Sequence, residues 1–433
     1  MTSPEQLLEL ARKSGAEVAE VFQSTSRSTP VSFEANRLKQ VENIEADGVA
    51  LRLWRNGQPG LAVAYGEVEP QALVDRALAL SELNAPEERQ LTTLAHPAYP
   101  TAGKVVSVQQ LVDWGNAAIG QVRHVQPEVL CGGGWDCETE TTRLINSVGL
   151  DCRYEDITLS GYLEVELVRG DDFLNISDGA TDRGNLDSVA FVQRILQHLA
   201  WCETNADPAE GRLPVLLTAK AMDLLWDPLY AALNGKRVLE QSSPWSDRLH
   251  QMVLAPQLTL RQDPNFGPFG CPFDDEGAMV QPLRLVERGK LQNFYADAKT
   301  GRELGTGTTG NGFRSDLGSY PTPRLCNFLV EPGTQSFEQL VASIDDGLIL
   351  DQVLGGGPGI SGDFSVNVDL GYRVKQGKIV GRVKDTMVAG NVYQTLQNPV
   401  ILGNDSDWSG SCWTPSAIVE GLSVVGRSVD MAD

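Results

Sequence analysis

Histidine and cysteine are the side chains best suited to metal or nucleophilic chemistry, and both are sparse in this chain of 433 residues. A catalytic zinc site needs three protein ligands and an open position, and a nucleophilic Cys or Ser needs an adjacent base. The histidines lie far apart, no two spaced to share a helical turn, and none falls near Cys271, Cys326 or Cys412 in the sequence. The spacing therefore predicts no local zinc motif and no catalytic pair of neighbours; the histidines are His96, His124, His198 and His250.

The seven cysteines are odd in number, scattered, and contain no C-x-x-C pair. Such a pattern is typical of reduced thiols that serve as small buried residues. We expect the same of Cys412, because one thiolate alone does not hold Zn²⁺ tightly.

The acidic run Asp274-Asp275-Glu276 could in principle chelate Mg²⁺ or Ca²⁺. Adjacent side chains on a strand point to opposite faces, however, so a solvated acidic turn is the better interpretation. The glycine-rich stretches 305–312 and 355–362 lack Gly-Lys-Ser/Thr and do not open a helix after a strand. They predict tight turns and close backbone approach rather than phosphate binding.

The segment Thr308–Asn327 is dense in Gly, Pro and amides, yet it lies between apolar segments of a long domain. Gly310 and Gly312 flank Asn311, and two prolines bracket Thr322, so the backbone is restricted to a few turns. A rigid loop of this kind lines a cleft or forms a plain surface connection, and both interpretations stay open.

Bulk composition excludes several classes of function. Formal net charge is -22, which disfavours direct binding to nucleic acid or to an anionic membrane. Hydrophobic residues make up 41%, no apolar run approaches the length of a membrane span, and no secretory signal precedes the first helix. The sequence predicts a cytoplasmic globular protein.

Periodicity predicts helix and sheet in alternating layers over the first half. Pro70 opens a helix, Asn56-Gly57 predicts a tight hairpin between two strands, and Ser3 with Gln6 forms a capping-box pattern. Further helices are expected over 108–124 and 186–205. Strands are expected over 17–23, 30–33, 48–54, 61–65, 129–135, 142–146, 151–154 and 157–168, with a linker over 87–104.

From residue 213 the chain becomes rich in Gly, Val and Leu with many short strands, and helices are expected to begin at Thr218 and Ser336. The fold class is α+β: N-terminal helix–sheet layers are followed by a mixed domain dominated by antiparallel, barrel-like sheet. We expect three domains: 1–95, 96–208 (packing with the first) and 209–433.

Several short motifs occur in a recognisable order in the last third. They are Phe273-Asp-Asp-Glu-Gly277, Thr309-Gly-Asn-Gly312, Pro321-Thr-Pro-Arg324, the run 355–365, Ala389-Gly-Asn391, the run 400–405 and Ser411-Cys412. In this order the chain resembles the TldD/PmbA family, specifically its PmbA (TldE) branch, over nearly its full length. An older label for this family is modulator of DNA gyrase.

The resemblance implies a subunit of a heterodimeric metalloprotease that acts on flexible peptides. In that family the TldD subunit carries zinc through His-Glu-x-x-x-His and a later Cys, whereas the PmbA-like subunit lacks these ligands. Aligned on Leu233-Asn-Gly235, the motif falls on residues 226–231, and Trp226, Asp227 and Ala231 stand in place of His, Glu and His. Cys412 matches the metal-binding cysteine, and Pro228 is expected to kink the helix.

We therefore expect a non-catalytic pseudoenzyme without its own cofactor, zinc being confined to a TldD-like partner. The resemblance and the bonding capacity of amides and guanidinium groups place four residues near a shared peptide chamber, or in internal loop support: Asn311, Arg314, Arg324 and Asn327. Two alternatives stay open: a stand-alone hydrolase that uses Cys412 or an acidic cluster, and a homodimeric binding protein.

Overall fold

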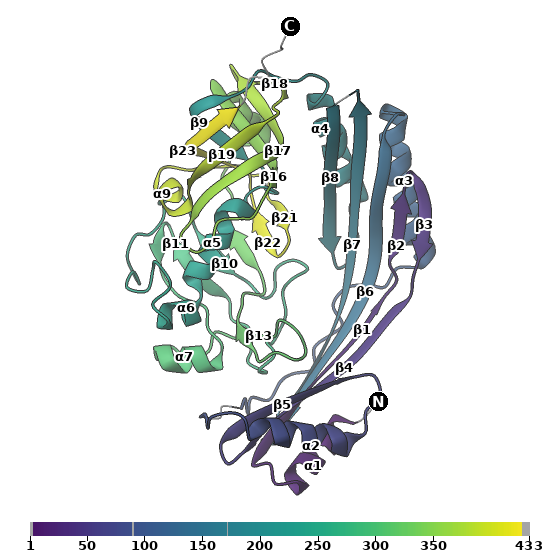
Figure 1. The fold of residues 1–433 in the computed structure, drawn as a ribbon, viewed down its shortest axis with the longest axis vertical. Helices are drawn as coiled ribbons and strands as arrows, with labels where there is room; N and C mark the ends of the chain where they lie inside the picture. Colours follow the sequence, from purple (N-terminus) through teal and green to yellow (C-terminus); the bar gives the residue numbers. More distant parts are fainter. Residues whose placement is uncertain (1–2, 89–90, 171, 427–433) are drawn as a thin grey trace.

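A long curved sheet forms the first half of the molecule and a barrel-bearing region forms the second half (Figure 1). The computed structural model describes residues 3–88, 91–170 and 172–426. No helix within these ranges is long and apolar enough to cross a bilayer.

Eight strands in antiparallel pairs make up the curved sheet. The strands β3-β2-β6-β1-β4-β5 lie in this order, while β7 pairs with β6, and β8 pairs with β7. Because strand pairs link residues before 95 with residues after 96, both predicted N-terminal segments contribute to one sheet. The bounds are β1 Val18–Ser28, β2 Val31–Glu34, β3 Arg37–Val41, β4 Ile44–Arg55, β5 Gln58–Tyr65, β6 Leu130–Asn146, β7 Asp151–Arg169 and β8 Asp172–Asp182.

Strands β6 and β7 correct the sequence-based prediction, which broke each of them in two. The intervening residues 136–141 stay in strand because all of them pair with β7, and residues 138–141 also pair with β1. At about 3.3 Å per residue, the 17 residues of β6 run the length of the sheet, from the N-terminal helices towards α3 and α4 (Figure 1).

Four helices cover the N-terminal half: α1 Pro4–Lys13, α2 Pro70–Ser81, α3 Val108–Val125 and α4 Ser188–Trp201. The predicted capping box is wrong, because the Ser3 hydroxyl bonds the Glu5 carboxylate instead of the helix backbone. The predicted hairpin is confirmed, with Asn56 and Gly57 both at positive φ between β4 and β5. The expected linker contains no helix or strand in its described part; residues 89 and 90 lie outside the described residues.

Five strands close into a barrel in the C-terminal half, which confirms the predicted fold class. The ring runs β16-β9-β23-β19-β17 and closes through pairing of β16 with β17. Strands of the barrel sheet are β9 Glu210–Leu217, β16 Asp346–Leu354, β17 Asp363–Lys375, β18 Lys378–Arg382, β19 Thr386–Asn391, β20 Ile401–Leu402 and β23 Ala417–Gly426.

A second, smaller sheet lies beside the barrel and carries the connections towards the N-terminal half. Its strands are β10 Leu260–Gln262, β11 Leu283–Glu287, β12 Lys290–Leu291, β15 Phe328–Val330, β21 Asp407–Ser409 and β22 Cys412–Thr414, while β13 Gly312–Phe313 and β14 Thr322–Pro323 form a separate pair. The helices here are α5 Asp223–Leu233, α6 Gly235–Leu239, α7 Ala298–Leu304, α8 Phe337–Ala342 and α9 Val392–Gln397. Helix α5 starts after a turn at Thr218, five residues later than expected.

One hydrophobic core joins the two halves. Phe191, Ile195 and Leu199 on α4 pack with residues of the long sheet and with Leu370 and Tyr372 on the outer face of the barrel. The barrel strands therefore bury side chains on both faces, because a separate core cluster fills the opposite side.

We expect substitution of Gly60 to test the packing of α2 on β5. A Cβ at this buried position would lie 2.0 Å from the Ala77 carbonyl oxygen, so Gly60→Ala should destabilise the chain by about 2 kcal/mol or more. Gly120 in α3 is the matched control: it is exposed and a Cβ there meets nothing within 4 Å. Gly120→Ala should stabilise the helix by about 1 kcal/mol. Urea unfolding followed by circular dichroism measures both, and equal effects would contradict this packing.

Candidate functional site

The loop 308–327 connects the C-terminal half to the N-terminal sheet. Its β13–β14 pair makes a hairpin, and at Gly48 on β4 a Cβ would meet the Leu317 side chain at 2.6 Å. Gly310 has φ 72°, and a Cβ there would lie 2.1 Å from the Met279 carbonyl oxygen, so only glycine fits. The loop is therefore fixed at both ends.

Asn311 and Asn327, two of the residues expected near a peptide chamber, are fully buried. The Asn311 amide donates to Gln262 Oε1 at 2.7 Å and to the Arg324 carbonyl at 2.8 Å. Asn327 accepts from the Asp263 backbone N–H and donates to the carbonyls of Asp263 and Phe266. Both amides thus hold loops together, which is the structural role that the sequence left open.

Arg314 and Arg324 lie in different environments. Arg314 is buried; it donates to the Ser319 carbonyl at 2.7 Å and lies 3.4 Å from Glu20 Oε1 on β1. Arg324 is exposed. The structure therefore does not gather the four expected residues on one wall.

A buried ion pair that the sequence reasoning missed completes this junction. Arg52 Nε on β4 lies 2.8 Å from Glu20 Oε1 on β1, and both side chains are less than a tenth exposed. The two residues are cross-strand partners in the β1–β4 register. A signal existed in the sequence, since each is a charged residue within an apolar strand, at positions that a hairpin-like pairing places opposite each other.

The acidic run 274–276 is not the solvated turn expected from the sequence. Asp274 is fully buried and accepts backbone N–H groups from Gly312, Ala278 and Glu276. Asp275 accepts the Arg314 backbone N–H, and Glu276 accepts that of Ala298 at 2.7 Å. Asp274 is buried, and Asp275 and Glu276 are half-buried, because the loop and the start of α7 supply donors that the local sequence does not reveal.

Burial raises the pKa of all three carboxyl groups of residues 274–276. It raises the pKa of Asp275 to about 6 and that of Glu276 to about 7, and it places the pKa of Asp274 well above its ordinary value. Asp275 and Glu276 therefore have pKa values close to neutral pH.

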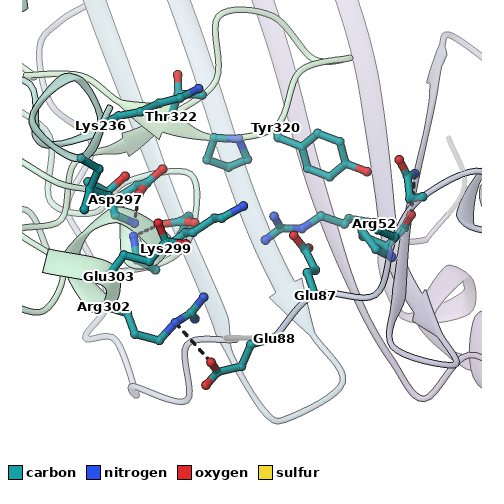
Figure 2. A pocket seen from close by; sticks show the side chains of 18 of the residues that line it. Arg52, Glu87, Glu88, Lys236, Asp297, Lys299, Arg302, Glu303, Tyr320 and Thr322 are labelled. Atoms are coloured by element: carbon teal, nitrogen blue, oxygen red, sulfur yellow. Dashed lines mark hydrogen bonds and ion pairs between the residues drawn. The ribbon is translucent and has the colours of Figure 1, made fainter. Parts of the chain in front are cut away.

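Two cavities of about 490 Å³ each flank the loop 308–327, which agrees with the cleft-lining interpretation. Phe313, Arg314 and Leu317 line one cavity together with β1 and β4. Tyr320 and Thr322 line the other, where Figure 2 shows Arg52, Glu87 and Tyr320 opposite Asp297, Lys299 and Glu303. Both charge signs are present, and Arg302 pairs with Glu88 at 3.4 Å across this cavity. Walls with charged groups of both signs can bind polar or charged groups of a ligand.

The helix aligned with a metal motif does pack against Cys412, but its side chains do not fit zinc. Trp226 is fully buried and its Nε1 donates to Thr414 Oγ1 at 2.9 Å, beside Cys412 on β22. An indole N–H has no lone pair to offer a metal, and Ala231 has no donor atom. In the described part of the chain, no three His, Cys, Asp or Glu side chains gather as a metal-binding group.

The remaining polar groups near Cys412 contact one another inside the core. The Tyr230 hydroxyl contacts the Cys412 sulfur, and burial raises the pKa of both groups well above their ordinary values. Burial also raises the pKa of Asp223, which accepts from the Ser409 hydroxyl at 2.6 Å, and the pKa of Asp227. A protonated, buried thiol is neither a ready nucleophile nor a ready metal ligand.

Comparison with known proteins agrees with this architecture. The models of the PmbA/TldA metallopeptidase C-terminal domain and of its domain 1 match residues 210–426 and 19–81, and the chain belongs to this PmbA/TldD metallopeptidase family. Among curated relatives, a metalloprotease of Methanothermobacter thermautotrophicus is 25% identical, covering 90% of this chain and 88% of that protein. The metalloprotease PmbA of Escherichia coli O157:H7 is 23% identical, covering 97% and 94%.

Solved structures share the fold over almost the whole chain. TldE from Thermococcus kodakarensis matches with a TM-score of 0.89 at 23% identity, covering 98% of this chain and 99% of that one. A proposed modulator of a DNA gyrase from Thermotoga maritima matches with a TM-score of 0.87 at 23% identity, covering 97% and 99%.

Asn311→Ala should destabilise the chain by about 2–4 kcal/mol, because it leaves Gln262 and the Arg324 carbonyl without their buried partner. Arg324→Ala, in the same loop but exposed, should change the free energy of unfolding by less than about 0.5 kcal/mol. Urea unfolding distinguishes the two, and a neutral Asn311→Ala would contradict the clamp role.

Stability should also depend on pH through Glu276. Its folded pKa, about 7, exceeds the ordinary 4.5, so the stability it contributes is full below about pH 4.5 and is lost as pH rises through 7. Glu276→Gln keeps an acceptor for the Ala298 N–H and should flatten the loss of melting temperature between pH 5 and 8. Exposed Glu67→Gln is the control; a slope equal in Glu276→Gln and wild type would argue against this titration.

Proposed function

We propose that this chain is a PmbA/TldE-like, non-catalytic subunit that acts in the cytoplasm with a zinc-bearing TldD-like partner on flexible peptides. The observation that carries the proposal is the pair of positions 226 and 231, where Trp226 and Ala231 occupy the places of two imidazole ligands. The indole is bonded to Thr414 and fully buried, so the helix is packed as a structural element.

The peptide-binding part of the proposal rests on the walls of the two loop cavities. They carry both charge signs and lie between the curved sheet and the C-terminal half, where an extended chain could bond polar side chains. Of the four residues expected near the chamber, Arg314 lines one of these cavities, and Arg324 is exposed beside them and free to meet a peptide carboxylate or carbonyl. Asn311 and Asn327 are fully buried and support the loop from beneath.

The proposal predicts that the purified chain holds no stoichiometric zinc and does not cleave casein. Co-expression with a TldD-like chain that carries His-Glu-x-x-x-His should give co-purification, about one zinc per pair and chelator-sensitive cleavage. The control is the same pair with the partner's motif Glu changed to Gln, which should assemble without cleaving.

Three outcomes oppose this assignment. Tightly held equimolar zinc in the isolated chain would overturn it. Cleavage by the isolated chain that survives a chelator would favour the stand-alone hydrolase, in which Cys412 or the acidic run does the chemistry. A stable homodimer that does not bind the TldD-like chain would favour the homodimeric binding protein.

Arg324→Ala should keep the pair assembled but raise KM for a peptide several-fold.

A further inference from the structure

A third and larger cavity, of about 670 Å³, lies between α4, β8 and the barrel. It shares no lining residue with the two cavities beside the loop 308–327. Its volume falls in the range of small-molecule sites, roughly 300–1,000 Å³. The proposed protease role does not use this cavity, and the sequence motif 400–405 reaches it only through Asp405.

The residues that line this cavity carry a net negative charge. Five carboxylates line it, and the fixed cations are Arg194 and Lys220. Arg194 is already engaged by Asp178 at 2.7 Å and by Asp407 at 3.1 Å. The remaining charge favours a cationic ligand. The carboxylates are those of Asp178, Glu338, Asp351, Asp405 and Asp407.

Asp351 is the buried carboxylate at the inner end. Only 4% of the residue is exposed, and it accepts the Thr218 hydroxyl at 2.8 Å. The other nearby donors in the described chain are too distant for hydrogen bonds: Lys220 Nζ lies 3.6 Å away and His198 Nε2 lies 3.7 Å away. A buried carboxylate with a single short hydrogen bond has acceptor capacity left for a ligand.

His198 presents an N–H beside this carboxylate. The Tyr372 hydroxyl lies 2.6 Å from His198 Nδ1 and 3.8 Å from Cys202 Sγ. We assign the hydroxyl as the donor to Nδ1, because His198 Nε2 faces the Asp351 carboxylate at 3.7 Å and a proton on Nε2 is favoured by that charge. Burial raises the pKa of Tyr372 and lowers that of His198, which keeps the hydroxyl protonated and the imidazole neutral. The imidazole proton is then on Nε2, which has no acceptor within hydrogen-bonding distance among the described residues, and His198 is one of the residues that line the cavity.

Aromatic rings flank this polar pair. Trp201 lies against His198 with ring centroids 5.0 Å apart, and Phe337 stacks on Trp201 at 5.9 Å. Trp408 and Tyr162 line the same cavity, and Tyr162 is 55% exposed. Rings beside an acidic centre suit an organic cation with an apolar group, through apolar contact and cation–π attraction.

We propose that this cavity binds an α-amino amide, the chemistry of a peptide's N-terminal residue. The ammonium group would donate to Asp351, the neighbouring carbonyl oxygen would accept from His198 Nε2, and the side chain would lie against Trp201 and Trp408. The site is independent of the zinc partner, so binding belongs to the isolated chain.

Calorimetric titration of the purified full chain with L-leucinamide tests the site, with N-acetyl-L-leucinamide and Nα-acetyl-L-lysinamide as comparison probes. Leucinamide should bind saturably. The acetylated leucinamide should bind at least about tenfold more weakly, because it lacks the charge that pairs with Asp351. This comparison needs no variant. Equal binding of both leucinamides, or no saturable binding of leucinamide, would overturn the proposal.

The variant Asp351→Asn keeps an acceptor for Thr218 and should weaken leucinamide binding at least about tenfold. The matched control is Asp385→Asn, at an exposed position with φ 45° that asparagine tolerates, and it should bind as wild type does. Unchanged binding in Asp351→Asn, or an equal loss in Asp385→Asn, contradicts the site. If Nα-acetyl-L-lysinamide binds more tightly than leucinamide, the ligand is a lysine side chain and not an N-terminal amino group. That result would contradict the proposed carbonyl contact to His198.

Discussion

The packing of α4 against the outer face of the barrel is the contact on which the rest of the structure depends. Apolar side chains of α4, of the long sheet and of barrel strands β16 and β17 form a single buried cluster. Without this packing, the barrel would expose one face to water, and the long sheet would lose its apolar contacts with the barrel. The hydrogen bond from Tyr372 to His198 crosses this contact and fixes the register between barrel and helix.

A second contact fixes the far end of the curved sheet, and it is polar. The Arg52–Glu20 pair, with Arg314 from the loop, is almost completely removed from water. Breaking such a pair is costly because it leaves a charge buried alone. These polar contacts act together with an apolar cluster in which Phe273 packs on Phe22 and Leu144 of the sheet, and the carboxyl groups of residues 274–276 make that junction sensitive to pH.

Helix α5 and strand β22 are held together by ordinary core contacts. Trp226 uses its single polar atom to bond Thr414, and the Cys412 thiol is covered by Tyr230. Both side chains therefore serve the packing of this core. The architecture around them stays intact, in agreement with the fold shared with TldE from Thermococcus kodakarensis.

The sequence by itself indicated many of the helices and strands, and it fixes which side chains stand at positions 226 and 231. Helical periodicity and the Asn56-Gly57 turn depend on residues that are neighbours in the sequence. Positions 226 and 231 hold Trp226 and Ala231, so no imidazole is present there in any fold. Tertiary structure alone decided which polar residues are buried and which charges meet. Asp351 and His198 are 153 residues apart in the numbering, and the acidic run 274–276 is buried by a loop that follows it in the chain. Burial, hydrogen bonding and pKa depend on neighbours that only the complete fold brings together, because local sequence carries no record of contacts made across such separations.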